Sequence, residues 1–149
     1  MTMGKMNMLL FFLAIVMLGN TCRNGNDDCH KTISFMNNSE SAVYVIWESE
    51  YPDTLYFGHF SSPALDPLLY KTLAKEQNTL AMSQGRDCWE SIFEYGVQIP
   101  SDTLMIYVFD AEVIETVPWS TVAHDYMVLK RYDFSLLDLQ KMNWTVTYP

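Results

Sequence analysis

Three histidines, His30, His59 and His124, are the side chains best suited to metal binding or proton transfer. None of them stands in an H-x-x-x-H pattern, and no C-x-x-C pair accompanies them. Residues 27–30 include ligands of suitable type, but this stretch is expected to belong to a polar tether ahead of the folded part. The sequence therefore predicts no metal site and no cofactor.

The sequence has no arrangement typical of nucleophilic or phosphoryl-transfer catalysis. It contains no G-x-S-x-G motif and no glycine-rich loop for phosphate. Its 18 acidic residues will bring some carboxylates together by chance, so spacing alone cannot identify a glycosidase pair. We therefore predict no catalytic residue. The alternative is a hydrolase or accessory enzyme that acts on glycan through carboxylates such as Asp110 or Glu112.

The four tryptophans are candidates for a surface on which a sugar ring stacks. Trp47, Trp89 and Trp144 fall on the inward sides of the elements expected around them, which predicts that they lie in the core. Trp119 follows Pro118 in a connection between elements. It is the tryptophan predicted to be exposed for binding.

The N-terminus is typical of a secretory signal peptide. Lys5 is the only charged residue before Arg23, and residues 8–18 form an unbroken apolar run. At about 1.5 Å per residue, this run is too short to cross a hydrocarbon core about 30 Å thick. We expect residues 1–21 to be a signal peptide, with a buried helix of the fold as the alternative.

Residues 18–22, with the sequence LGNTC, resemble the lipobox of bacterial lipoproteins, in which the cysteine becomes the lipidated first residue. That motif usually has Leu three residues before the cysteine, where this chain has Gly19, and it rarely has Asn20 and Thr21 between them. The resemblance implies lipidation at Cys22, and the polar residues that follow predict a tether over residues 22–30. The competing interpretation is ordinary signal-peptidase cleavage and a soluble exported protein.

Cys29 and Cys88 remain once Cys22 is assigned to a lipid. Two cysteines in an exported chain indicate one disulfide. Closing a loop of about 60 residues would stabilise the fold by roughly 4 kcal/mol in the chain-entropy model. Two buried free thiols are the alternative, which a count of free thiols on denatured protein distinguishes.

A repeated tripeptide predicts a covalent modification. Residues 53–55 and 102–104 both read Asp-Thr-Leu. Both resemble the Asp-Ser/Thr-aliphatic signal for O-glycosylation on exported proteins of some Gram-negative anaerobes, which implies glycans on Thr54 and Thr103. The alternative is a turn that leads into a strand, where Asp and Thr are favoured by local hydrogen bonds.

Composition limits the classes of protein to consider. The chain has 149 residues, 49% of them hydrophobic and 14% aromatic, which suffices for one domain with a substantial core. The formal charge is −9 and the pI is about 4.5. Because an acidic chain lacks the cationic surface that phosphates attract, we expect no nucleic-acid partner and membrane contact only through the lipid anchor.

The elements expected around these residues are mostly strands. Residues 102–110 alternate two sets of apolar side chains, which predicts a strand covered on both faces with Ile106 at its heart. Residues 31–36 and 42–47 flank a turn sequence and predict a β-hairpin. Further strands are predicted at residues 55–57, 78–82, 126–134 and 144–148.

Loops and short helices fill the remainder. Residues 58–71 contain Ser-Pro and Asp-Pro, which predict a long surface loop and the first place to expect a binding surface. Apolar spacing and caps predict short helices over residues 87–96, 116–123 and 135–143. Six or seven strands with two to three short helices predict a mainly β single domain over residues 31–149, a β-sandwich or an α+β roll.

The C-terminal part of the chain carries a resemblance. The segments LKRYD (129–133), SLLDLQ (135–140) and NWTVTYP (143–149) are similar to those of a group of small exported lipoproteins from Gram-negative anaerobes. That group has no assigned activity. The resemblance therefore implies a location in the cell envelope and no particular chemistry.

Together these features predict a lipid-anchored, non-enzymatic binding or assembly module of the cell envelope, in the periplasm or on the cell surface at the outer membrane. The expected partner is an envelope protein or a glycan. Two alternatives stay open beside the glycan-acting hydrolase: a structural subunit that pairs through a sheet edge, and a soluble periplasmic protein.

Overall fold

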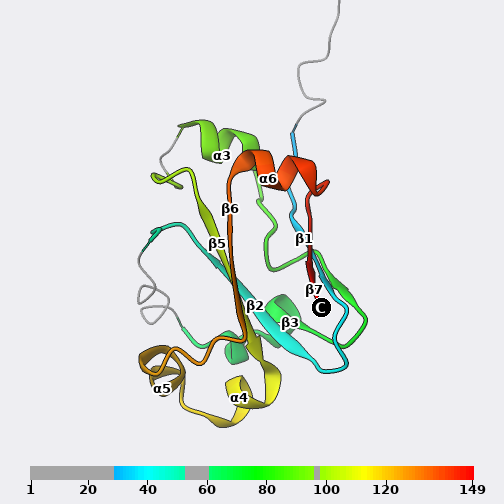
Figure 1. Cartoon of the computed structure of the whole chain (residues 1–149), viewed down its shortest axis with the longest axis vertical. Helices are drawn as coiled ribbons and strands as arrows, with labels where there is room; N and C mark the ends of the chain where they lie inside the picture. Colours follow the sequence, from blue (N-terminus) through cyan, green and yellow to red (C-terminus); the bar gives the residue numbers. More distant parts are fainter. Residues whose placement is uncertain (1–28, 53–60, 96–97) are drawn as a thin grey trace, which may run out of the picture.

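The structure is a computed structural model that describes residues 29–52, 61–95 and 98–149. Within these ranges, seven strands form two sheets, with five short α-helices around them (Figure 1). The predicted β-rich single domain is confirmed, as an α+β fold with more helices than expected. The predicted signal peptide, Cys22, Thr54, the strand at 55–57 and His59 lie outside the described residues.

The larger sheet is antiparallel, and its strands follow the order β3-β2-β5-β6. The smaller sheet has the order β4-β1-β7, in which β1 is antiparallel to β4 and parallel to β7. The strands are β1 (Ser34–Asn37), β2 (Val43–Glu48), β3 (Lys71–Thr72), β4 (Gln77–Asn78), β5 (Leu104–Asp110), β6 (Lys130–Phe134) and β7 (Thr145–Tyr148).

Short helices close the fold at both ends of the sheets (Figure 1). They are the 3-10 turn η2 (Pro63–Leu65), α2 (Pro67–Tyr70), α3 (Trp89–Tyr95), α4 (Ala111–Thr116), α5 (Trp119–His124) and α6 (Leu136–Lys141). Among the described residues, no helix has the length and apolar character to span a bilayer.

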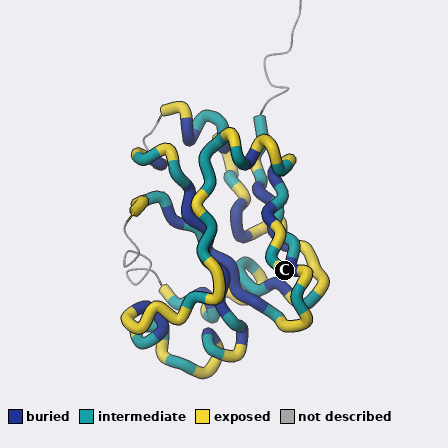
Figure 2. The backbone as a smooth tube through the Cα atoms, viewed as in Figure 1, coloured by how far each residue is buried: buried dark blue, intermediate teal, exposed yellow. Residues whose placement is uncertain are grey.

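Strand β5 is the centre of the molecule, as the sequence predicted. Its residues from 104 to 109 are all 0% exposed, and the strand runs as a dark line through the middle of Figure 2. One face joins a core between the two sheets, and the other joins a second core covered by α4 and α5. Ile106 pairs with Trp47 on β2 and with Tyr132 on β6, so it lies inside the sheet and not at its edge.

The predicted hairpin of residues 31–36 and 42–47 is wrong. Strand β1 pairs with β4 and β7, whereas β2 pairs with β3 and β5, so the turn between them passes from one sheet to the other. Asn37 is fully buried, and its side chain stabilises the turn that passes between the two sheets. Its amide donates to the carbonyl oxygens of Ser41 (2.8 Å) and Leu73 (3.0 Å), and its oxygen accepts from the Ser39 N–H (3.0 Å).

The predicted surface loop contains helical turns in its described part. Pro63 and Pro67, which predicted a loop, instead open η2 and α2. Proline is tolerated in the first turn, because the N–H that it lacks has no partner there. Ser62 accepts a hydrogen bond from the Ala64 N–H (3.3 Å), and Asp66 accepts one from the Leu69 N–H (3.2 Å).

The remaining helices show which capping signals in the sequence correspond to caps in the structure. The predicted capping box of α6 is present, with Ser135 accepting from the Asp138 N–H and Asp138 accepting from the Ser135 N–H. Helix α4 was not predicted; Asp110 caps it by accepting from two backbone N–H groups. Thr116 ends α4 and does not cap α5, since its hydroxyl donates to the Glu112 carbonyl oxygen (2.6 Å).

Three predicted strands are shorter in the structure. Only the first residue of the stretch 78–82 belongs to β4, because the Asn78 side chain accepts from the Leu80 and Ala81 N–H groups and turns the chain. Strand β6 begins at Lys130, after a segment where Tyr126 has a φ of 50°. Strand β7 begins after Trp144, which is buried at a φ of 56°.

Candidate functional site

A cavity of about 610 Å³ lies beside the second half of β2. Strand β3 pairs only with Val43 and Tyr44, so among the described strands the rest of β2 pairs with β5 alone. The cavity is lined on one side by residues 46–50 and on the other by η2, α2 and the residues just before them. We call it the acidic cavity, because Glu48, Glu50 and Asp66 line it. Its volume is typical of small-molecule sites.

The alternation of strand β2 brings Glu48 to the inner part of the acidic cavity. Side chains two apart on a strand share a face, so Glu48 follows Tyr44 and Ile46, both of which are buried in the second core. Glu48 is only 5% exposed. Glu50 and Asp66 are exposed, which places them at the mouth of the acidic cavity.

Glu48 lies in an unfavourable electrostatic environment. Burial raises the pKa of its carboxyl group to about 7, and the negative charge of Glu50 acts in the same direction. A hydrogen bond from the Ser49 N–H lowers the pKa without cancelling the burial effect. Among the described residues, no Lys, Arg or His forms an ion pair with Glu48.

Basic residues on the neighbouring strands are engaged with other acids. Lys71 Nζ lies 2.5 Å from a Glu115 carboxylate oxygen and 5.9 Å from the centre of the Tyr44 ring. Arg131 Nε lies 2.6 Å from an Asp133 carboxylate oxygen. In the described part of the chain, no basic residue lines the acidic cavity.

Aromatic rings and aliphatic side chains complete the lining. Trp47 is half-buried and meets the ring of Trp89 edge-on, with 5.2 Å between centroids. Tyr70, also half-buried, comes from α2 on the opposite wall, together with Leu69. The acidic cavity therefore combines carboxylates with ring surfaces that a cation or a sugar contacts favourably.

The tryptophan predicted to be exposed lies elsewhere. Trp119 begins α5, is half-buried and packs edge-on against Phe109 at 5.6 Å between ring centroids. It is therefore part of the boundary of the second core and not an open platform. Of the carboxylates considered for a hydrolase, Asp110 caps α4 and Glu112 is exposed on its first turn; neither lines the acidic cavity.

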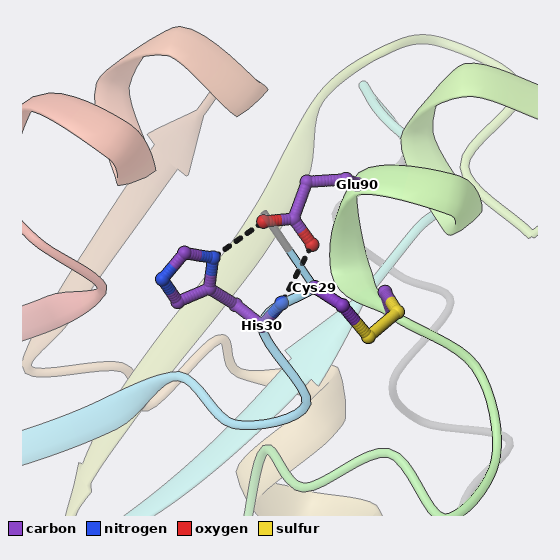
Figure 3. Close-up of a disulfide and its surroundings, with 4 residues drawn as sticks. Cys29, His30 and Glu90 are labelled. Atoms are coloured by element: carbon purple, nitrogen blue, oxygen red, sulfur yellow. Dashed lines mark hydrogen bonds and ion pairs between the residues drawn. A yellow bond between two sulfur atoms is a disulfide. The ribbon is translucent and has the colours of Figure 1, made fainter. Parts of the chain in front are cut away.

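The structure joins Cys29 and Cys88 in a disulfide, with 5.1 Å between their Cα atoms (Figure 3). The adjacent His30 is fixed by Glu90, whose two carboxylate oxygens lie 2.9 Å from the backbone nitrogen and 2.5 Å from Nδ1 (Figure 3). The imidazole also stacks on Trp144, with 4.4 Å between centroids. The end of the predicted tether is thus attached firmly to the folded domain.

The remaining predicted residues do not gather into a site. Thr103 is half-buried just before β5, and its hydroxyl donates to the Ser101 carbonyl oxygen (3.2 Å). His124 is exposed at the end of α5, beside Asp125. Over the residues that the structure describes, no group of three His, Cys, Asp or Glu side chains is placed to hold a metal ion.

Glu48 is not among the residues predicted to form a site, although the sequence contains a signal for it. Tyr44, Ile46 and Glu48 share one face of β2, so a carboxylate follows two apolar residues on a face that packs into the second core. A charged residue at a buried strand position is rare unless it is paired or functional.

No protein-family model, curated protein or solved structure matches the chain.

Proposed function

We propose that this protein is a cell-envelope lipoprotein whose domain is a non-enzymatic binding module, with the acidic cavity as its binding site. Glu48 is the observation that carries the proposal. It is a carboxylate 5% exposed, lining a cavity of about 610 Å³, without a basic partner among the described residues. An unpaired buried charge lowers stability, and such costs are typical of functional sites.

The proposed location follows from the cysteines. The Cys29–Cys88 disulfide is typical of domains that fold outside the reducing cytoplasm. The lipobox-like residues before Cys22 support an anchor at that cysteine. Because residues 29 and 30 are attached to the domain, the tether between anchor and domain would be short.

Intact-mass analysis of protein from native-host membranes is expected to find Cys22 as the first residue, carrying a diacylglyceryl thioether. An inhibitor of the lipoprotein peptidase should cause the unprocessed chain to accumulate. Cys22→Ala is the control, because it removes the thiol that accepts the lipid and should remove the lipid mass. An unmodified Cys22 in the wild-type protein would contradict the anchor.

Photo-crosslinking in the native host tests the acidic cavity as a binding site. A photoreactive residue in place of Leu65, which is 78% exposed at the rim, should give a discrete adduct that mass spectrometry identifies as protein or glycan. The matched control is Leu80, which is 57% exposed and does not line the cavity. Equal labelling at both positions, or none at Leu65, would contradict the proposal.

A second candidate function is a glycan-acting hydrolase. The pKa of Glu48, raised by burial to about 7, suits a general acid, and Glu50 lies nearby as a second carboxylate. Release of reducing sugar from envelope glycan, abolished by Glu48→Gln, would favour the enzyme over the module. The sheet-edge alternative has less support at β6, because this outer strand carries Lys130, Arg131 and Asp133, charges typical of protected edges.

A further inference from the structure

We infer that the acidic cavity binds an organic cation, an ammonium or guanidinium group carried on a short apolar stem, with its charge against Glu48. The inference rests on the proposed function, since it takes the acidic cavity as the binding site. It adds the charge and the shape of the ligand, which the proposed function leaves open.

The charge of the lining supports a cationic ligand. Glu48, Glu50 and Asp66 are all acidic, and no basic residue lines the acidic cavity in the described part of the chain. Lys71 and Arg131, on strands of the same sheet, are held by Glu115 and Asp133. The described residues therefore supply no counter-charge to Glu48, and a ligand cation would supply one in a buried place where solvent screens the attraction least.

The distribution of polar and apolar groups supports a stem. The most buried carboxylate is at the inner end, whereas Glu50 and Asp66 are exposed at the mouth. The same lining also includes Ile46, Leu69 and the half-buried rings of Trp47 and Tyr70. An alkyl stem packs well against such a lining, and an ammonium or guanidinium head is attracted both by Glu48 and by ring faces.

Other ligand classes fit less well. A divalent metal needs several oxygen ligands around one point, and no group of three candidate ligands is so placed among the described residues. A neutral sugar would stack on Trp47 or Tyr70, but it would leave the charge of Glu48 unpaired. The sugar would also displace water from around that charge, which costs further free energy. A carboxylate or phosphate ligand would add repulsion from all three acids.

Calorimetric titration of the processed full chain in detergent at pH 8 tests this inference. The cationic probes are 1,5-diaminopentane, as a free amine, and a capped Ala-Lys-Ala peptide, as a basic side chain. The neutral counterparts are 1,5-pentanediol and capped Ala-Met-Ala. We expect at least one cation to bind about tenfold more tightly than its counterpart, and its identity assigns the source of the cation.

Single substitutions test whether the bound cation contacts Glu48. Glu48→Gln should weaken binding of that cation by about tenfold or more, because it removes the charge and keeps the shape. Glu76→Gln makes the same change at an exposed position outside the acidic cavity and should leave the affinity within about twofold. Should Glu48→Gln fail to fold, Glu50→Gln at the mouth replaces it, with a smaller expected loss.

Three results would overturn the inference. Equal affinity for cations and their neutral counterparts, or equal losses in Glu48→Gln and Glu76→Gln, would show that Glu48 does not select charge. No binding of any probe would overturn it as well. In each case the photo-crosslinking at Leu65 decides separately whether the acidic cavity is a binding site, so the two failures are distinguishable.

Discussion

Replacing both cysteines of the disulfide with serine, in C29S/C88S, is expected to lower the free energy of unfolding by about 4 kcal/mol. The bond closes a loop in which the two residues are 59 positions apart. Without it, the unfolded chain gains the conformational freedom that the loop had removed. The end of the tether would also lose the bond that supports the contact between His30 and Glu90. Urea unfolding of purified protein measures the loss.

The single variants C29S and C88S are the matched controls. Each breaks the same bond, so all three variants should unfold at the same urea concentration. Equal losses would assign the effect to the bond and not to either side chain. An unchanged midpoint in C29S/C88S, or free thiols in the denatured wild-type protein, would contradict a stabilising disulfide.

Glu48→Gln is expected to make the folded protein more stable at pH 8, by about 2 kcal/mol, and to leave stability nearly unchanged at pH 4. A change that removes a buried group usually destabilises. Here the opposite sign is expected, because burial and the charge of Glu50 raise the pKa of Glu48 from 4.5 to about 7. The wild-type protein therefore bears the cost of a buried charge at neutral pH.

The direction of the pH effect follows from proton binding. Below pH 4.5 the carboxyl group is protonated in both the folded and the unfolded state, so Glu and Gln behave alike. Between about 4.5 and 7 the unfolded chain releases this proton while the folded protein keeps it, so wild-type stability falls as pH rises. Above pH 7 both states are ionised and the full penalty persists. Relaxation and solvent screening reduce the penalty below the value that the whole pKa shift would give.

Urea unfolding at pH 4, 6 and 8 measures this effect, with Glu76→Gln as the matched control. Glu76 is exposed, so its replacement should change stability by less than about 0.5 kcal/mol at each pH. A Glu48→Gln variant that is less stable than the wild type at pH 8 would show that Glu48 has a stabilising partner. The acidic cavity would then lose its strongest support as a binding site.

The features predicted correctly are those that a short stretch of sequence determines. Alternation over residues 102–110 required apolar cover on both faces, and the structure supplies it from two separate cores. The capping box of Ser135 and Asp138 involves hydrogen bonds within one helical turn. No knowledge of the rest of the chain was needed in either case.

The hairpin failed because pairing depends on distant residues. The segments that became β1 and β2 both had strand character, and the polar residues between them did mark a turn. What the sequence did not reveal is that β1 takes β7 as a partner and that Asn37 hydrogen-bonds to Leu73 across the crossing. Helix α4 was missed for a related reason: Asp110 ends a strand and caps a helix at once.

The acidic cavity was located only in part. The stretch 58–71 was predicted to contribute a binding surface, and residues 61–70 contribute to the lining. The sequence does not predict the helical turns of this stretch, because Pro63 and Pro67 are as typical of loops as of the first turn of a helix. Glu48 was overlooked because its burial depends on the opposite wall, which a reading of β2 alone does not include.

The parallel pairing of β1 with β7 has a consequence for biogenesis. Ser34 aligns with Thr145 and Asn37 with Tyr148, so the smaller sheet joins segments separated by almost the whole domain. A nascent polypeptide cannot complete that sheet until the residues of β7 have been synthesised, and pairings over such separations form slowly. All strands of the larger sheet precede β7 in the chain, so the smaller sheet would be the last to be completed.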